Sequence, residues 1–478
     1  MKKILKYATL ILLLFVSFSF VLTGCKKDNK DPNTPSSTDR VYGNGGLAVT
    51  KGEYLYFLNG YRTYTDVTKD DRNNLSNDKN VVRGAIYKTK LTATGDLNLD
   101  ADGNIVASSV ERVVDQIACF ENGGLYIVGS YIYYATPNTQ DDKEANLLNS
   151  YVNYCRVNLN NPSDKKVLYT SNGAVSDGEW HVYEMNGDIY LVIRNDSKIV
   201  CIKNAETKDV VNMLESTNVK FWANEDGHAV ANHEQYVYYT RDLKDSDPVS
   251  TGNVVARVKI GTDKEEVIAR DGNSYTLETL KNNKIYYKDS GSKLRVADPL
   301  FRKVIGDKAL TQKSYDKMFV IDNQDANSTL NRVLVSESET VNDATIMTLT
   351  YFDNGSWTGT QVYSGSSVEI LDVDGNYVYM FKDSSIYRLD ILSGVETKLN
   401  NGDESSLNFS ASQKMCFDVD VNYAYILNGY NVEGTTVYYL ERVDMTTSSP
   451  VSVFVGQFED GEAPVVEEDE EETTEENK

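Results

Sequence analysis

Histidine, tryptophan, cysteine and proline are all scarce in this chain of 478 residues, which has 3, 3, 5 and 8 of them. So few histidines and cysteines, with no C-x-x-C pair, offer little to a zinc ion. The motifs G-x-S-x-G and H-E-x-x-H and the phosphate-binding P-loop are also missing. The sequence therefore gives no sign of a zinc enzyme, a serine hydrolase or a nucleotide-binding enzyme.

Positive charge is also in short supply, because 48 Lys and Arg face 71 Asp and Glu, for a net charge of −23. A chain this acidic repels nucleic acid and anionic lipid headgroups, so neither is an expected partner. Residues 459–478 hold eleven acidic residues and one lysine. We expect them to form a disordered, solubilising tail, with binding of a cation or a partner as the alternative.

Helical periodicity is nearly absent, and a short strand-like phrase with a central tyrosine recurs instead. Its third residue falls at Tyr56, Tyr133, Tyr190, Tyr238, Tyr286, Leu334, Tyr379 and Tyr425. The steps between these positions are 77, 57, 48, 48, 48, 45 and 46 residues. A period in the forties with β-rich content is typical of β-propeller blades.

Each repeat divides into four strand-like pieces, most clearly at 368–373, 377–381, 385–391 and 395–399, with Gly, Asn and Asp at the turns. The sequence therefore predicts an all-β fold, a propeller of eight four-stranded blades over residues 45–458. The predicted blades begin near residues 45, 113, 175, 218, 274, 316, 368 and 408. Seven blades is the alternative, because Leu334 replaces the tyrosine of the sixth repeat.

The long first step indicates an insertion in the first repeat, an extra hairpin made by 97–99 and 105–107. Its turn offers oxygen ligands at Asn98, Asp100, Asp102 and Asn104, the pattern that begins a calcium loop. Ser109 stands where such a loop needs a bidentate Glu. We therefore favour a metal-free hairpin, with calcium as the alternative and no other cofactor expected.

The first twenty-five residues contain a targeting signal. Lys2, Lys3 and Lys6 precede an apolar stretch over 8–22, which is too short for a comfortable membrane span. The stretch ends in Leu-Thr-Gly-Cys25, which resembles the lipobox of bacterial lipoproteins. The resemblance implies a signal peptide over 1–24, lipidation of Cys25 and anchoring by acyl chains. An ordinary signal peptide is the alternative.

The residues after Cys25 lack the apolar side chains needed for packing, so 25–44 are expected to form a flexible tether. Anchoring of this kind places the protein on the extracytoplasmic face of the bacterial cell membrane.

The second and third strands of the repeats resemble the Tyr-Trp-Thr-Asp blades of low-density-lipoprotein-receptor propellers. The likeness is carried by 237–242 with 255–258, and by Val378, Tyr379 and Asp383 with 386–388. It is shared with uncharacterised receptor-like lipoproteins of low-GC bacteria, and it implies a propeller over 45–458. The tryptophan is missing throughout and the receptors have six units, so receptor-like ligand recognition is not implied.

Few side chains are candidates for catalysis or metal binding. His181, His228 and His233 are interpreted as surface-loop histidines, and no catalytic residue or binding residue is nominated. Cys119, Cys155, Cys201 and Cys416 stand among apolar neighbours and are expected to be buried free thiols, with disulfides as the alternative.

Two classes of function remain after these exclusions. The sequence favours a membrane-anchored module that binds a protein or a glycan and is not an enzyme. The alternative is an extracytoplasmic enzyme acting on polysaccharide, a lyase or a glycosidase. Fold alone does not decide between them.

Overall fold

The computed structural model of this protein divides into two compact units, Met1–Arg40 and Val41–Lys478. The residues described here all belong to the second unit. They are 41–61, 81–101, 103–118, 124–137, 152–171, 178–195, 198–205, 210–215, 236–281, 284–301, 303–306, 309–311, 314–321, 332–353, 356–383, 385–399, 415–417, 423–432, 435–445 and 452–458. The predicted signal peptide, Cys25, most of the tether and the acidic tail lie outside them.

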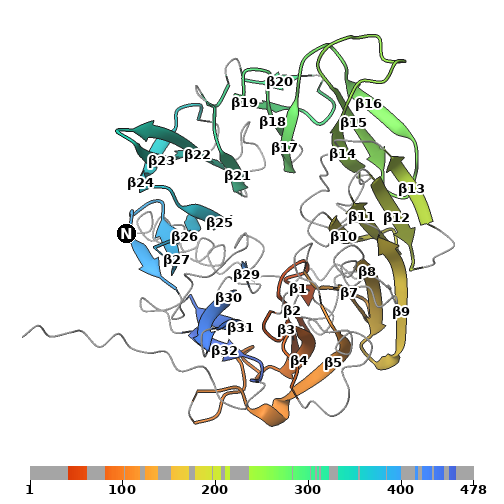
Figure 1. Cartoon of the computed structure of the whole chain (residues 1–478), viewed down its shortest axis with the longest axis vertical. Helices are drawn as coiled ribbons and strands as arrows, with labels where there is room; N and C mark the ends of the chain where they lie inside the picture. The colour runs from red at the N-terminus through yellow and green to blue at the C-terminus, as the bar shows by residue number, and fades with distance from the viewer. Residues whose placement is uncertain are drawn as a thin grey trace, which may run out of the picture. The chain divides into compact units, whose positions relative to one another are not determined.

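Eight antiparallel sheets follow one another along the second unit, and each is one blade (Figure 1). Blade one contains β1 (Val41–Tyr42), β2 (Ala48–Lys51), β3 (Tyr54–Leu58), β4 (Ala85–Lys90) and β5 (Val110–Ile117). Blade two contains β6 (Tyr126–Val128), β7 (Tyr131–Pro137), β8 (Val152–Asn158) and β9 (Asn161–Ser171). Blade three contains β10 (Gly178–Met185), β11 (Asp188–Asn195), β12 (Lys198–Lys203) and β13 (Val210–Glu215). Blade four contains β14 (Tyr236–Arg241), β15 (Val254–Lys259) and β16 (Glu265–Ala269).

The second half of the chain repeats the same order of strands. Blade five contains β17 (Thr276–Lys281), β18 (Lys284–Lys288), β19 (Leu294–Ala297) and β20 (Val304–Ile305). Blade six contains β21 (Lys317–Ile321), β22 (Arg332–Val341), β23 (Ala344–Phe352) and β24 (Thr360–Ser366). Blade seven contains β25 (Glu369–Asp374), β26 (Tyr377–Lys382), β27 (Ser385–Asp390) and β28 (Glu396–Lys398). Blade eight contains β29 (Met415–Phe417), β30 (Tyr423–Val432), β31 (Thr435–Asp444) and β32 (Ser452–Val455).

The prediction of an all-β propeller with eight blades is confirmed, and the sixth repeat is a full blade despite its leucine. Among the described residues the only helix is the short 3-10 turn η1 (Ala107–Ser109). One predicted boundary was wrong, since residues 110–117 form β5, the outer strand of blade one, and do not begin blade two. The insertion in the first repeat moves this strand further along the sequence, so blade two begins at β6.

The central residue of the repeated phrase is a packing residue. In seven blades it is less than 8 % exposed, as Tyr56, Tyr133, Tyr238, Tyr286, Leu334, Tyr379 and Tyr425. Tyr190 of blade three is partly buried. Alternate residues of each strand face opposite neighbours, so each blade is buried on both sides by the next and the previous one. Leu371, Tyr379 and Ile386 of blade seven, for example, pack against Ala424 and Ile426 of blade eight.

The first and last blades are tied together by backbone and side-chain hydrogen bonds. The Tyr61 amide donates to the Tyr438 carbonyl at 3.1 Å. Asn59 accepts from the Gln457 amide at 3.0 Å and donates to its carbonyl at 3.2 Å. A Cβ at Gly456 (φ +118°) would stand 2.0 Å from Asn59 Oδ1, so a side chain there would break the joint. These contacts close the ring of blades by joining the first blade to the last.

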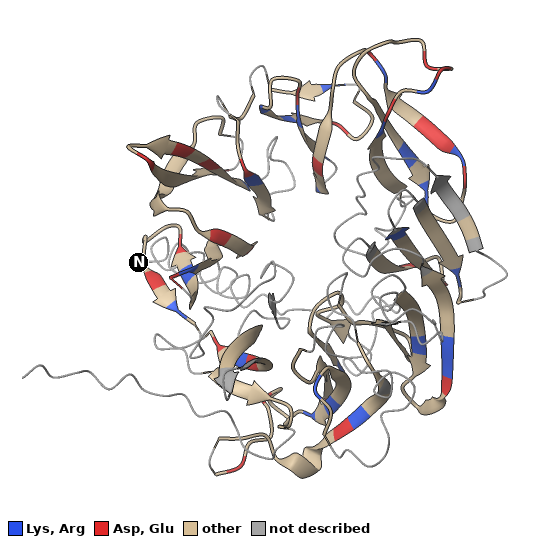
Figure 2. Cartoon of the chain, viewed as in Figure 1, with Lys and Arg blue, Asp and Glu red and all other residues tan. Residues whose placement is uncertain are grey.

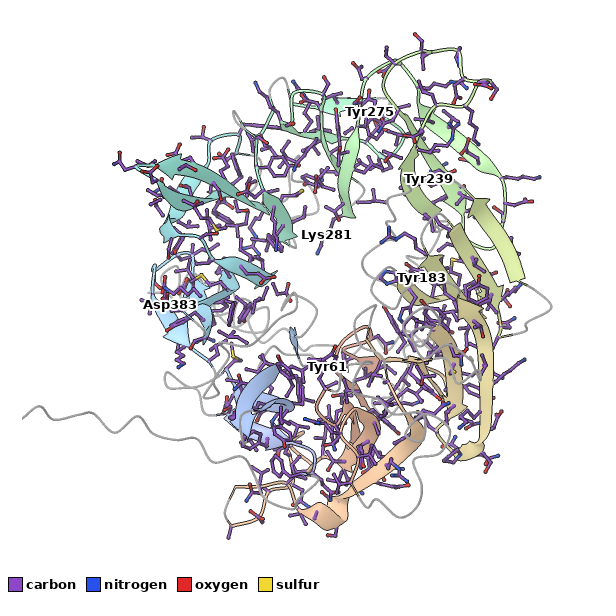
Figure 3. All side chains as sticks on the ribbon, viewed as in Figure 1. Tyr61, Tyr183, Tyr239, Tyr275, Lys281 and Asp383 are labelled. Atoms are coloured by element: carbon purple, nitrogen blue, oxygen red, sulfur yellow. The ribbon has the colours of Figure 1, made fainter. Side chains whose placement is uncertain are left out.

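The propeller has two faces, which differ in the turns that lie on them. The strand that carries the repeated tyrosine phrase follows a turn at one end of its blade, as at Lys51–Tyr54 between β2 and β3 and at Asp374–Tyr377 between β25 and β26. We call this end of the blades the proximal face. The opposite end, where the second strand turns into the third as at Val341–Ala344, is the distal face. Innermost strands such as β17 border the middle of the ring, towards which Lys281 extends (Figure 3).

Candidate functional site

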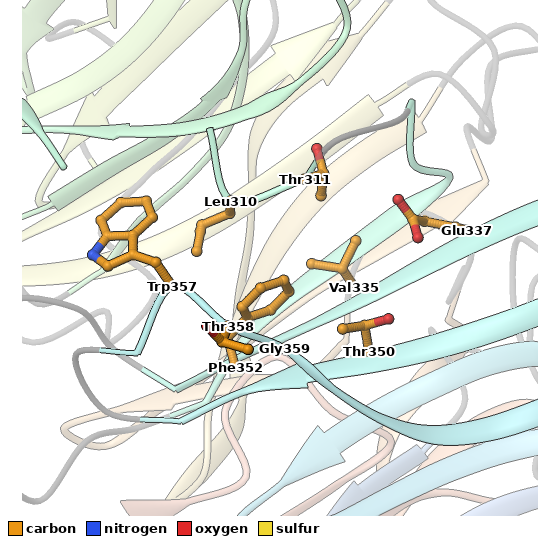
Figure 4. A pocket seen from close by; sticks show the side chains of 9 residues that line it. All are labelled: Leu310, Thr311, Val335, Glu337, Thr350, Phe352, Trp357, Thr358 and Gly359. Atoms are coloured by element: carbon orange, nitrogen blue, oxygen red, sulfur yellow. The ribbon is translucent and has the colours of Figure 1, made fainter. Parts of the chain in front are cut away.

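A pocket of about 350 Å³ lies between blades five and six (Figure 4). Leu310 and Thr311 come from the segment that joins β20 to β21. Val335 and Glu337 come from β22, Thr350 and Phe352 from β23, and Trp357, Thr358 and Gly359 from the turn before β24. The pocket is therefore built by one blade and by the segment that leads into it.

Two local features hold the walls of this pocket in place. The connecting segment is fixed to blade five, because the Leu310 amide donates to the Leu294 carbonyl and the Leu294 amide donates to Thr311 Oγ1. The indole of Trp357 lies against the backbone of Gly306, where a Cβ would come within 2.3 Å of the ring. Gly306 has φ +82°, which favours glycine independently of the ring. Trp357 can therefore bridge the two blades only because residue 306 has no side chain.

The chemical character of the lining is mixed. Phe352 and Leu310 are buried apolar side chains, and Trp357 is half-buried. Three threonine hydroxyls and the half-buried carboxylate of Glu337 supply polar groups. The nine lining residues include no Lys, Arg, His or Cys. The described part of the lining therefore offers an aromatic surface and hydrogen-bonding oxygens, but no base of ordinary pKa near neutrality and no thiol nucleophile.

Outside the pocket, a tyrosine hydroxyl and a histidine lie in contact on the innermost strands of blades two and three. The Tyr126 hydroxyl on β6 lies 3.1 Å from His181 Nδ1 on β10, and it donates to the Trp180 carbonyl at 3.2 Å. The prediction that His181 lies in a surface loop was wrong, because residues 180–183 alternate in facing and belong to a strand. His228 and His233 lie outside the described residues.

The candidate calcium loop is a hairpin in the described residues. Leu99 and Ile105 form an antiparallel bridge, and Asp100 Oδ1 accepts from the Asn104 amide at 2.9 Å. Gly103 has the positive φ of a tight turn. Asp102 lies outside the described residues, and no three His, Cys, Asp or Glu side chains elsewhere in the described strands and turns converge as metal ligands. The hairpin prediction is confirmed, while calcium binding stays an untested prediction.

Two of the cysteines can be placed in the fold. Cys155 on β8 and Cys201 on β12 are buried free thiols, as expected. Burial raises the pKa of each thiol to about 12, so both are inert at neutral pH. Cys25 and Cys119 lie outside the described residues, and only the backbone of Cys416 is described.

Sequence reasoning missed a buried ion-pair network in blade four. The guanidinium of Arg241, whose side chain is 2 % exposed, donates to Asp247 at 2.8 Å and to Glu265 at 2.9 Å. Arg270 reaches Asp247 from the rim at 3.4 Å. The hydrogen bond from Arg241 holds the pKa of Asp247 well below its usual range. These bonds fix the long connection between β14 and β15 onto the blade.

A buried carboxyl in blade eight is a second feature that the sequence did not reveal. Glu441 on β31 is 1 % exposed and accepts hydrogen bonds from the Tyr430 hydroxyl and from Asn428 Nδ2. No cation is paired with it among the described residues. Burial raises the pKa of Glu441, so the fold favours the neutral acid.

We expect Glu441→Gln to stabilise the protein as the pH rises. The stability contributed by neutral Glu441 is complete below its unfolded-state pKa of about 4.3 and is lost as the pH rises through the higher folded-state pKa. Gln keeps an acceptor for Tyr430 and Asn428 and never ionises. Thermal unfolding from pH 4 to 8 should show a variant advantage that grows with pH. The exposed Glu266→Gln is the control, and an equal gain there would contradict the account.

The sequence matches no protein-family model, and no curated protein is significantly similar to it. The described residues also contain no helix that is long and apolar enough to cross a membrane.

Three solved structures with a similar fold are distant from this chain in sequence. An oligogalacturonate lyase of Vibrio parahaemolyticus is 13 % identical with a TM-score of 0.41, over 66 % of this chain and 88 % of that one. The polysaccharide lyase Uly1 is 10 % identical with a TM-score of 0.36, over 67 % and 89 %. Dipeptidyl peptidase 4 of Porphyromonas gingivalis is 11 % identical with a TM-score of 0.44, over 87 % and 59 %. Resemblances this weak assign neither an activity nor a ligand to the present chain.

Proposed function

We propose that this protein is a lipid-anchored extracytoplasmic β-propeller that binds a glycan in the pocket between blades five and six. The observation that carries the proposal is the composition of that pocket. Sugar rings present apolar C–H faces together with many hydroxyls. Trp357 and Phe352 supply an aromatic surface on which the C–H faces can pack. Glu337 and the threonines supply hydrogen-bond partners for the hydroxyls.

The charge of the pocket lining indicates which class of glycan fits best. Among the described lining residues Glu337 is the only charged one, so an anionic sugar would approach a carboxylate there. A neutral sugar would accept or donate hydrogen bonds there, and an amino sugar would add an ion pair. We therefore assign neutral or amino sugars to the pocket.

The anchor rests on the sequence alone. The basic start, the short apolar stretch and the Leu-Thr-Gly-Cys25 motif support lipidation of Cys25, and two or more acyl chains are what stable attachment requires. The likeness to receptor-type propellers also stays a hypothesis, supported by the tyrosine strands and by the arginine in the following strand. Both proposals agree with a function at the cell surface.

A screen of the full chain against cell-wall glycans and peptides tests the proposal when binding and turnover are measured together. We expect binding of a neutral or amino-sugar glycan with no change in its mass. Binding of peptides alone would overturn the glycan assignment, and so would a preference for acidic glycans.

The contact between Tyr126 and His181 favours an enzyme as the second candidate. A hydroxyl beside an imidazole on two innermost strands is an arrangement that can move a proton. Turnover of a polysaccharide in the same screen, lost in His181→Gln with folding intact, would establish this alternative. Turnover that survives that change would place the chemistry elsewhere.

A further inference from the structure

Blade seven carries an exposed apolar tip on the proximal face. Leu392 and Val395, in the turn from β27 to β28, are 71 % and 58 % exposed, and Tyr377 beside them is 36 % exposed. Tyr377 pairs with Asp390 in the sheet, so the three side chains project from the same end of the blade. Exposed apolar groups gathered in one place mark an interaction surface more often than scattered ones do.

The tip is held in shape by hydrogen bonds. The Asp390 carboxylate accepts from the Leu392 amide at 2.9 Å, and the Asp390 carbonyl accepts from the Gly394 amide at 2.8 Å. The Asp390 amide closes the turn on the Val395 carbonyl at 3.0 Å. The turn needs none of its apolar side chains for this geometry, since they point to solvent. Their exposure therefore calls for an explanation outside the fold of blade seven.

A tyrosine lies under an arginine in blades two, four, seven and eight. The distances from cation to ring centre are 4.1 Å for Arg156 and Tyr131, 3.9 Å for Arg257 and Tyr236, 4.8 Å for Arg388 and Tyr377, and 3.9 Å for Arg442 and Tyr423. Tyr131, Tyr377 and Tyr423 begin the second strands of their blades, and Tyr236 begins β14, the first described strand of blade four. Tyrosine with arginine or lysine is a side-chain combination found where proteins meet the interfacial layer of a bilayer. Arg156, Arg257 and Arg388 are half-buried and could take part in such a contact, whereas Arg442 is only 6 % exposed and serves the packing of blade eight.

The charges near the proximal face do not by themselves account for binding to a partner. Arg257 is paired with Glu266, and Lys88 above Tyr54 is paired with Glu111. Figure 2 shows acidic and basic residues interspersed along the strands. A partner that required strong positive charge would therefore find little net attraction, whereas an apolar and aromatic contact needs none.

The chain itself indicates what lies next to this face. Val41, the first described residue, pairs with Lys51 at the first turn of blade one, so the chain enters the propeller on the proximal face. Val41 follows Cys25 by sixteen positions in the chain. Fully extended, this segment spans at most about 55 Å. An anchor at Cys25 thus keeps the proximal face within one tether length of the bilayer.

We propose that the proximal face lies against the membrane and that Leu392, Val395 and Tyr377 enter its interfacial layer. The inference rests on the lipid anchor of the proposed function and does not depend on the glycan pocket. It predicts contact with neutral lipids as well as anionic ones, because the interaction is apolar and the body of the protein is acidic.

Depth measurements on the full, lipidated chain test the proposal. Leu392→Cys carries an environment-sensitive dye, and the protein is reconstituted into phosphatidylcholine vesicles, with and without phosphatidylglycerol. We expect the emission to shift to the blue and to be quenched by lipids with a shallow quencher in both vesicle types. Val341→Cys is the matched control, because Val341 is 39 % exposed and lies on the distal face. The parent chain, labelled in parallel, gives the background from its own cysteines.

The outcomes separate docking from anchoring. One outcome is protein that stays bound to vesicles, is released from them by Cys25→Ala, and yet keeps its dye at 392 in water. That result would overturn docking and leave the anchor standing. Protein that does not associate with vesicles would overturn the anchor, and docking with it. Quenching between two labels at 392 without vesicles would show that a second copy covers the tip, which would also overturn docking. Equal responses at 392 and 341 would contradict a single membrane-facing side.

Discussion

Replacing Tyr379 by alanine should lower the free energy of unfolding by roughly 3–5 kcal/mol, as other aromatic truncations in cores do. Tyr379 is fully buried where blades seven and eight meet. The neighbouring backbone is fixed in sheets, so it can close only part of the cavity that the ring leaves. Chemical denaturation followed by far-UV circular dichroism measures the loss.

Tyr377→Ala is the matched control for this prediction. It removes the same side chain two residues away on β26, where the ring is 36 % exposed and lies under Arg388. The loss of that cation–π contact should cost only about 0.5–1 kcal/mol. Equal effects from the two substitutions would mean that the repeated tyrosines do not hold the blades together.

Arg241→Met should destabilise the protein by about 3–5 kcal/mol, because it removes the main partner of the buried Asp247 carboxylate and of the partly buried Glu265 carboxylate. Met replaces the aliphatic part of the arginine side chain and carries no charge, so the change removes the ion pairs while keeping most of the packing. Arg270→Met is the control, since Arg270 is 39 % exposed and reaches Asp247 only from the rim. Its loss should cost at most about 1 kcal/mol.

The cost of Arg241→Met should also depend on pH. The pKa of Asp247 is lowered in the fold, so its stabilising contribution is complete above the unfolded-state value of about 4 and is lost as the pH falls. Denaturation curves at pH 7 and pH 3 should therefore show a larger penalty at pH 7. A penalty that does not change between these pH values would mean that packing, and not charge, makes Arg241 important.

The propeller could be predicted because its signal repeats. A strand phrase, a turn and an alternating strand return eight times, with a central tyrosine in seven of the repeats, so the single departure at Leu334 does not hide the period. The boundary of blade two failed for the opposite reason. The insertion after β4 occurs once, and nothing in the period shows that residues 110–117 complete the first blade.

The candidate site could not be predicted in the same way. Trp357 lies against Gly306, and Arg241 binds Glu265 across a loop, but neither pair has a spacing that recurs. Contacts of this kind depend on the angle between blades and on the path of their connections. His181 is different, because the alternation of apolar and polar side chains in residues 180–183 is itself typical of a strand.

Titration of the full chain and of Trp357→Ala with the glycan selected by the screen tests the central proposal most directly. Calorimetry should show at least about a 30-fold loss of affinity in the variant, as expected for an aromatic residue worth about 2 kcal/mol at the centre of a contact. Tyr377→Ala, which changes a residue of blade seven that does not line the pocket, should bind as the parent does. Unchanged affinity in a folded Trp357→Ala protein would contradict a glycan site between blades five and six.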